Sequence, residues 1–153
     1  MRNIWLVALL LWIGLATNAL AEPVVIQLTQ TACQFVESEK QDYGFISHQA
    51  EDCVQINKAT EAKRLHDAKV LVLKPGTYTF RVLNRDVPYR LAFWLRGKGL
   101  GRLTLPSVSG GGIHAGESRD YTITLEKGEY LYSCPLNPTP DYRLVVSDSK
   151  GTP

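Results

Sequence analysis

The chain has 153 residues, of which 44% are hydrophobic and 21% are charged. This length corresponds to one domain, and the apolar fraction is sufficient for one hydrophobic core. With 17 Lys and Arg residues against 15 Asp and Glu residues, the formal net charge is only +2. So weak a charge excludes a field strong enough to recruit nucleic acid or anionic lipid.

The first 21 residues have the pattern of a secretory signal peptide. Arg2 gives a positive start, residues 4–16 are apolar, and residues 19–21 form a small-x-small cleavage signal before Glu22. The apolar run is short for a bilayer span, so an uncleaved membrane anchor is the less favoured alternative. We expect cleavage near Ala21-Glu22, a periplasmic or secreted protein, and no transmembrane segment in the mature chain.

The mature chain contains three cysteines, an odd number for a protein of an oxidising compartment. Cys33 and Cys53 lie in one irregular segment, and we predict a disulfide between them. The competing pairing joins Cys134 to one of these two. If Cys134 is the unpaired thiol, it is buried, metal-bound or reactive, and we expect it to be poorly accessible.

Residues 30–69 interrupt a β pattern that begins with a strand at residues 24–29. The segment is polar, and residues 60–65 have the pattern of a helix start, with Thr60 as the candidate N-cap and helix formers after it. We interpret residues 30–69 as a partly helical insertion that the Cys33–Cys53 disulfide holds in place. Its simplest role is a lid over one open end of a β-sandwich.

From residue 70 onward the chain alternates between β patterns and turns. Residues 96–117 are rich in glycine and are interpreted as a long loop, with at most a short strand at 102–105. Residues 22–147 therefore predict an all-β, antiparallel sandwich of about seven strands, followed by a flexible tail at 148–153. The further strands are expected at residues 70–73, 77–83, 91–95, 121–125, 128–134 and 144–146.

The segment from Gly128 to Val146 is predicted to be a strand, a stiff loop and a second strand. Tyr130, Tyr132 and Cys134 share one parity, so a strand turns all three toward the same face. Three prolines between residues 135 and 140 end that strand at the cysteine. An inward-facing cysteine at this point can be one metal ligand or a small buried thiol.

Three motifs in a fixed order resemble the cupredoxins, the family of plastocyanin and azurin. They are residues 75–84, residues 115–118 and residues 128–135, which resemble the strands and turn around that family's copper ligands. Together they cover about half of the mature chain. The resemblance implies a Greek-key β-sandwich with a short helical insertion near the N-terminus, and a periplasmic copper protein as the nearest functional analogy.

The resemblance fails at the ligand positions. A type 1 copper site needs two imidazoles, one thiolate and a weak axial ligand. Tyr89 stands where the resemblance implies the first histidine, Asn137 where it implies the second, and Tyr142 near the axial position. Only Cys134 remains at a matched position, so we expect no intense blue colour with Cu(II).

Two function classes follow, and an enzyme is not among them because the sequence contains no recognisable catalytic motif. The first is a periplasmic metal-handling or electron-transfer module with an altered, non-blue site built from Cys134, His114, Tyr89 and Tyr142. Copper is then the expected metal, with iron or zinc less favoured, and no metal if the site is fully lost.

The alternative is a metal-free cupredoxin-fold module that binds a protein partner. Its binding loop contains Asn137 and Pro138, and Tyr89, Tyr142 and Leu105 are candidates for a flat docking patch beside it. In both classes the expected partner is a periplasmic or inner-membrane protein.

Overall fold

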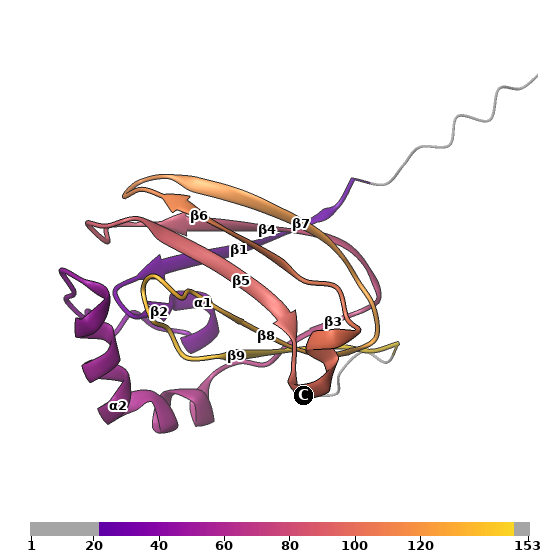
Figure 1. Cartoon of the computed structure of the whole chain (residues 1–153), viewed down its shortest axis with the longest axis horizontal. Coiled ribbons are helices and arrows are strands. Elements are labelled where there is room, and N and C mark those ends of the chain that lie inside the picture. Colours follow the sequence, from indigo (N-terminus) through magenta and orange to yellow (C-terminus); the bar gives the residue numbers. More distant parts are fainter. Residues whose placement is uncertain (1–21, 149–153) are drawn as a thin grey trace, which may run out of the picture.

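The computed structural model describes residues 22–148, so the predicted signal peptide and most of the predicted tail lie outside the described residues. Most of the ordered elements are strands, with one long helix near the N-terminus (Figure 1). In chain order they are β1 (Val24–Thr31), β2 (Gln34–Phe35), α1 (Val36–Glu39), α2 (Ala50–Asp67), β3 (Leu71–Leu73), β4 (Gly76–Asn84), β5 (Leu91–Gly97), the 3₁₀ helix η1 (Gly99–Leu103), β6 (Val108–Ile113), β7 (Ser118–Leu125), β8 (Gly128–Ser133) and β9 (Tyr142–Val146).

The strands form two sheets that pack face to face, which confirms the predicted β-sandwich. One sheet has the order β2-β1-β4-β7 and the other has the order β3-β9-β8-β5-β6. Each sheet contains one parallel pair, β1 with β4 and β3 with β9, so the pairing is mixed rather than wholly antiparallel. A parallel pair needs a long connection, and the insertion between β1 and β4 supplies one.

Inward-facing aromatic side chains fill the space between the sheets. The parity predicted for β8 is confirmed, since Tyr130 and Tyr132 are both buried. The ring of Phe93 from β5 lies 5.7 Å from that of Phe80 on β4 and 6.2 Å from that of Phe35. Such pairs add about 0.5–1.5 kcal/mol each beyond the area they bury.

The prediction of a loop over residues 96–117 is wrong, because these residues form η1 and the edge strand β6. Gly110 lies where the ring of Tyr121 crosses β6, and a Cβ atom there would approach Tyr121 Cε1 to 2.9 Å. The Tyr121 hydroxyl donates to the Gly110 carbonyl at 3.0 Å. Glycine in a strand often marks such a close approach. In the sequence alone, the same glycines also indicate a loop, so the sequence does not distinguish β6 from a loop.

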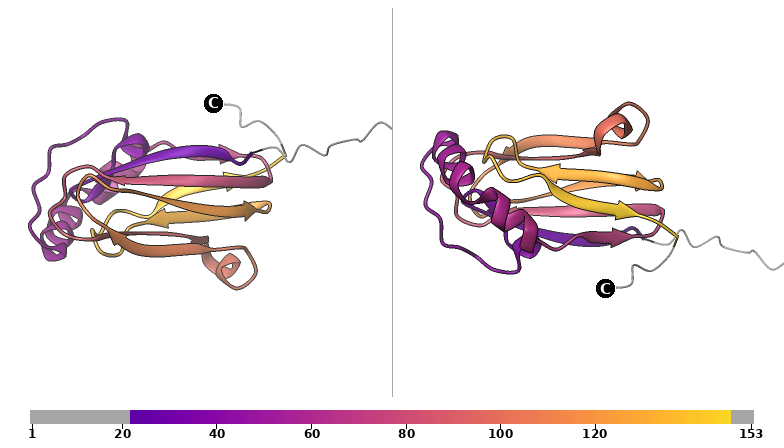
Figure 2. Two further views of the ribbon diagram at one scale, coloured as in Figure 1. Left: turned by 90° about the horizontal axis from the view of Figure 1, so that it is seen from above. Right: turned by 90° about the horizontal axis from the view of Figure 1, so that it is seen from below.

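The helix of the insertion is longer than predicted and begins earlier. α2 starts at Ala50, where the Asp52 carboxylate accepts the backbone N–H groups of His48 and Gln49 at 2.8 and 3.2 Å. Thr60 is therefore inside the helix, and its hydroxyl donates to the Ile56 carbonyl. α2 and the loop before it lie across one end of the sandwich (Figure 2). Within residues 22–148, no helix is long and apolar enough to cross a membrane.

Candidate functional site

Cys134 follows β8 at the covered end of the sandwich and is 1% exposed. Its Sγ accepts the backbone N–H of Ala92 at 3.3 Å and that of Asn137 at 3.2 Å. Burial raises the pKa of the Cys134 thiol, and the two N–H groups oppose that shift only in part. The predicted inaccessibility of this thiol agrees with its burial, and the thiol is neutral near pH 7.

Asn137 is fully buried and connects three segments of the chain. Its Oδ1 accepts the N–H of Cys33 at 2.9 Å and the hydroxyl of Tyr89 at 3.1 Å. Its Nδ2 donates to the Thr31 carbonyl at 2.9 Å. Its backbone N–H donates to Cys134 Sγ, so the side-chain oxygen, the side-chain nitrogen and the backbone N–H of Asn137 each have a partner within the protein.

Tyr89 occupies the position that the resemblance assigns to the first histidine, and Asn84 holds its backbone there. The side-chain amide of Asn84 donates to the carbonyls of Val87 and Tyr89 at 3.1 and 3.3 Å. The Tyr89 hydroxyl lies 2.8 Å from the Ser47 hydroxyl of the insertion. Burial raises the pKa of the Tyr89 phenol, so it remains a neutral hydrogen-bonding group rather than a phenolate.

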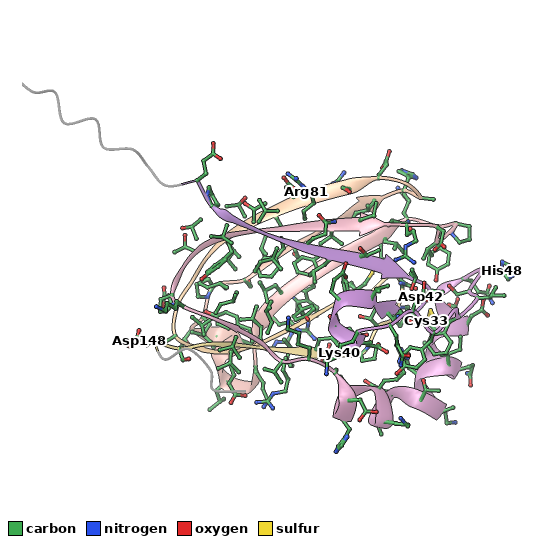
Figure 3. All side chains as sticks on the ribbon, turned by 180° about the vertical axis from the view of Figure 1, so that it is seen from behind. Cys33, Lys40, Asp42, His48, Arg81 and Asp148 are labelled. Carbon is green, nitrogen blue, oxygen red and sulfur yellow. A yellow bond between two sulfur atoms is a disulfide. The ribbon has the colours of Figure 1, made fainter. Side chains whose placement is uncertain are left out.

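The disulfide between Cys33 and Cys53 is present, which confirms the predicted pairing and leaves Cys134 as a free thiol. Figure 3 shows Cys33 where the insertion meets the sandwich. Both half-cystines are fully buried, and Cys53 Sγ lies 3.2 Å from Asn137 Oδ1. The disulfide therefore packs against the residue that replaces the second histidine.

Tyr142 lies in a different environment, a buried ionic cluster beneath α2. Its hydroxyl donates to the carboxylate of Glu39, which also forms a 2.6 Å ion pair with Arg64. Burial, and then the neighbouring negative charge of Glu39, raise the pKa of Tyr142 strongly. Arg64 Nη2 also donates to the Cys33 carbonyl at 2.8 Å, so this cluster helps to fix α2 on the sandwich.

The helix α2 also holds the loop that contains Asn137. Asn57 Nδ2 donates to the Pro138 carbonyl at 2.6 Å, and Asn57 Oδ1 accepts a hydrogen bond from Arg64 Nη1 at 2.8 Å. Of the predicted binding loop, Asn137 is thus buried and Pro138 is covered in part. Leu136, at 46% exposed, is the large apolar residue that this loop presents to solvent.

The predicted flat docking patch does not form. Tyr142 is fully buried, and Leu105 packs against Gly128 at the start of β8, whereas Cys134 follows the end of that strand. We call the region that does form the capped end: residues 134–139, Tyr89, the Cys33–Cys53 disulfide and α2.

The three histidines of the chain are all exposed. The backbone N–H of His114 donates to Glu117 within the turn between β6 and β7, and His66 pairs with Asp67 on α2. His48 lies on the outer rim of the insertion (Figure 3). Thus Cys134 and Tyr89 both contact Asn137, whereas His114 and Tyr142 have other surroundings.

The residues at the capped end do not fit a type 1 copper site. Among residues 22–148 the three histidines are exposed while Cys134 is buried, and the side-chain oxygen and nitrogen of Asn137 are paired with protein groups. Within the part of the chain that the structure describes, no group of three or more His, Cys, Asp or Glu side chains could hold a metal ion. Binding a metal through Cys134 and Tyr89 would first break the hydrogen bonds of Asn137.

The sequence matches no protein-family model and no curated protein. In structure, the chain is similar to auracyanin A, a "blue" copper protein from the green thermophilic photosynthetic bacterium Chloroflexus aurantiacus. The identity is 16%, the match covers 82% of this chain and 99% of that chain, and the TM-score is 0.46. The match to auracyanin B has 15% identity and a TM-score of 0.48, and it covers 80% of this chain and 88% of the auracyanin B chain. The chain is also similar to a reduced amicyanin variant, with 22% identity. That match covers 50% of this chain and 68% of the amicyanin chain, and its TM-score is 0.36.

These likenesses carry no inference about copper or function in this chain. Its own architecture is the cupredoxin-like β-sandwich that the sequence predicts: two facing sheets, a helical insertion near the N-terminus, and a cysteine after the next-to-last strand. The ligand positions differ, and function must be argued from the residues present.

Sequence reasoning missed two parts of this region. Gln30 is fully buried on β1; its Nε2 donates to the Ala92 carbonyl at 2.9 Å, and its Oε1 has no hydrogen-bond partner among residues 22–148. Its parity with Leu28 was the available signal for an inward-facing amide. The Glu39–Arg64 pair joins residues 25 positions apart, and no local pattern indicates that pairing.

Proposed function

We propose that the protein is a protein-binding module of the bacterial cell envelope, built on a cupredoxin-like sandwich that does not hold type 1 copper. The observation that carries this proposal is the pairing of Asn137. An amide stands at the position of the second histidine, and its polar atoms bind Cys33, Thr31 and Tyr89. A metal would have to displace these contacts, whereas a binding role leaves them intact.

Two features support a location in the periplasm or outside the cell. A buried disulfide is a stable feature of proteins in oxidising compartments and is rare in the cytosol. The pattern of residues 1–21 agrees with export, although those residues lie outside the described part of the chain. We propose no catalytic role, and the partner is a protein of the same compartment.

One observation favours the second candidate, a non-blue metal site. The Sγ of Cys134 accepts two backbone N–H groups, and such donors would stabilise a thiolate ligand. Copper is the metal that a thiolate-containing site would favour, with zinc or iron after it. Against this, the thiol is 1% exposed and its pKa is raised by burial.

A metal titration separates the two candidates. The mature protein, residues 22–153, would be titrated with Cu(I), Cu(II), Zn(II) and Fe(III) under absorbance and calorimetry, with Cys134→Ser as the matched variant. The binding-module proposal expects no one-to-one binding that depends on Cys134, and no thiolate charge-transfer band. Tight binding of any of these ions that is lost in Cys134→Ser would reject the proposal and establish a metal site instead.

A further inference from the structure

The 3₁₀ helix η1 carries the two most exposed large apolar side chains of residues 22–148. Leu100 is 85% exposed and Leu103 is 84% exposed. Side chains three positions apart lie on the same face of a 3₁₀ helix, so the two leucines form one apolar surface. η1 projects beyond the two sheets in both views of Figure 2. We call η1 with these two leucines the apolar tip.

Backbone hydrogen bonds hold the apolar tip in its position. The backbone N–H of Leu105 donates to the Gly101 carbonyl at 2.8 Å, which closes the turn. The backbone N–H of Lys98 donates to the Glu129 carbonyl at 2.8 Å, which joins the start of the tip to β8. The side chain of Leu105 packs inward against Gly128. The fold therefore turns one leucine of this segment inward and presents the other two to solvent.

The cations beside the apolar tip outnumber the carboxylates. Lys98 and Arg143 share the one carboxylate of Glu129, at 2.8 and 3.6 Å. The guanidinium of Arg102 lies 5.1 Å from the ring centre of Trp94 and has no ion pair within residues 22–148. These four charged residues therefore leave two positive charges unmatched.

The charged residues of the neighbouring strands and turn reduce this excess to one. Arg96 pairs with Asp141 at 2.6 Å, and Lys127 pairs with Asp148. Glu126, in the turn between β7 and β8, offsets one of the two unmatched cations. An excess of one cation complements the phosphates of lipid headgroups locally. It is a weak attraction, so any binding to a membrane at this end must come mainly from the two leucines.

The chain enters the sandwich at the same end. Val24, at the start of β1, pairs with Tyr78, and Tyr78 pairs with Ile123 close to the turn between β7 and β8. The apolar tip contacts β8 directly after that turn. Residues 1–21 lie outside the described residues, and their sequence is typical of a segment that enters a membrane during export. The end that carries the apolar tip is thus the end at which the chain is joined to that segment.

We infer that the apolar tip docks the protein on a phospholipid bilayer of the cell envelope. Leu100 and Leu103 enter the boundary between headgroups and acyl chains, where they leave water. The long side chains of Lys98 and Arg102 reach the headgroup phosphates. A projecting tip suits this occupant, because a bilayer receives protruding side chains without a matching hollow. The inference goes beyond the proposed function and does not rest on it, since the capped end is the opposite end of the sandwich.

Vesicle binding by the mature protein, residues 22–153, tests this inference. The probes are vesicles of phosphatidylcholine and vesicles of an equal mixture of phosphatidylcholine and phosphatidylglycerol, and cosedimentation measures the affinity. Both are expected to bind, the mixed vesicles about fivefold more tightly, which is the value of one net cation at an anionic surface. Trp94 is the only tryptophan in the sequence of residues 22–153, and it lies beside Arg102 of the tip. Brominated acyl chains should therefore quench its fluorescence in the bound state.

Matched variants assign the binding to the tip. The double variant Leu100→Ser with Leu103→Ser is expected to weaken binding to both kinds of vesicle at least about tenfold, because the leucines no longer leave water on docking. Ile46→Ser is the control, since Ile46 is 75% exposed on the insertion at the opposite end, and it should change the affinity less than about twofold. Arg102→Gln should remove the preference for the mixed vesicles while binding to phosphatidylcholine changes less than about twofold.

The inference is overturned if the wild type binds neither kind of vesicle, or if Ile46→Ser loses as much affinity as the double serine variant. It is also overturned if the wild type forms a dimer that the double serine variant dissolves, because the tip would then bind a second copy. Since both leucines are exposed, the double variant should unfold at the same denaturant concentration as the wild type. None of these results changes the metal titration, so a failed tip and a failed binding-module proposal are distinguishable.

Discussion

The capped end and the open edge of the same sandwich satisfy their polar groups in opposite ways. At the capped end, Asn137, Tyr89 and the disulfide pair with one another beneath α2. Along residues 24–28 of β1, which we call the open edge, the side away from β4 has no neighbouring strand within residues 22–148, and Glu37 caps the adjacent N–H of Thr29. The capped end therefore leaves its side-chain polar groups paired within the chain, whereas β1 leaves backbone groups unpaired by a neighbouring strand over residues 24–28.

The largest loss of stability is expected at the ionic cluster of the capped end, formed by Glu39, Arg64 and Tyr142. Arg64→Met leaves the Glu39 carboxylate buried without its partner, and we expect it to lower the free energy of unfolding by about 3–5 kcal/mol. Chemical denaturation measures this change. Lys63→Met is the matched control one residue away, because the Lys63–Asp67 pair is exposed. Losing that exposed pair should leave the free energy of unfolding nearly unchanged.

A second substitution distinguishes the lost ion pair from lost packing. In the double variant Arg64→Met with Glu39→Gln, no buried charge remains. At least about 2 kcal/mol of the loss should therefore be recovered, because an unpaired buried charge is the larger part of such a cost. Equal stability of the single and double variants would contradict the role assigned to this pair.

Asn137→Ala is expected to have the next largest effect. It leaves the Cys33 N–H and the Thr31 carbonyl without their partners, and each unsatisfied buried group costs about 1–3 kcal/mol. We therefore expect a loss of about 3 kcal/mol in thermal or chemical unfolding. Gln55→Ala, on the exposed face of α2, is the control and should change stability by less than about 0.5 kcal/mol. A loss no larger than the control's would show that Asn137 is not the organising residue of the capped end.

The pH dependence of unfolding tests the core between the two regions, at Tyr132. Burial raises the pKa of Tyr132 from 10.0 to about 12. The unfolded phenol releases its proton near pH 10, while the folded one keeps it, so stability is complete below pH 10 and falls between pH 10 and pH 12. This residue should account for about 2–3 kcal/mol of that fall.

Tyr132→Phe isolates this contribution. The variant loses the hydrogen bond to Ser38 at every pH, so its stability at pH 8 should be slightly lower. Between pH 10 and pH 12, the free energy of unfolding should fall less in the variant than in the wild type. The difference between the two decreases should equal the contribution assigned to Tyr132. Parallel curves would mean that the phenol ionises in the folded state as readily as in the unfolded one.

Local patterns predicted the sandwich and much of the capped end, but not how the end is filled. Alternation placed Phe80, Tyr130 and Tyr132 correctly, because side-chain direction in a strand follows from parity alone. The disulfide followed from two cysteines in one irregular segment. The contacts of Asn137 with Cys33 join residues 104 positions apart, and no spacing rule reaches that far.

The errors have physical reasons of the same kind. The glycines of β6 predict a loop because glycine favours loops locally, whereas in the structure Gly110 makes room for Tyr121 from the other sheet. Thr60 predicts a helix start eleven residues too late, because the N-cap is Gln49 and the carboxylate that supports it, Asp52, lies inside the first turn of α2. The open edge was not visible in the sequence, since an unpaired strand has the same alternation as a paired one.

The smallest predicted effect concerns Gln27, at the open edge of β1. If the Gln27 N–H points outward, Gln27→Pro removes no hydrogen bond of the β1–β4 ladder, and proline suits the extended conformation there. Stability should then change by no more than about 0.5 kcal/mol. Ile26→Pro, one residue away, removes an inward-ladder N–H and should cost at least about 2 kcal/mol. Equal losses for the two prolines would place the Gln27 N–H within the sheet and close the edge to a partner strand.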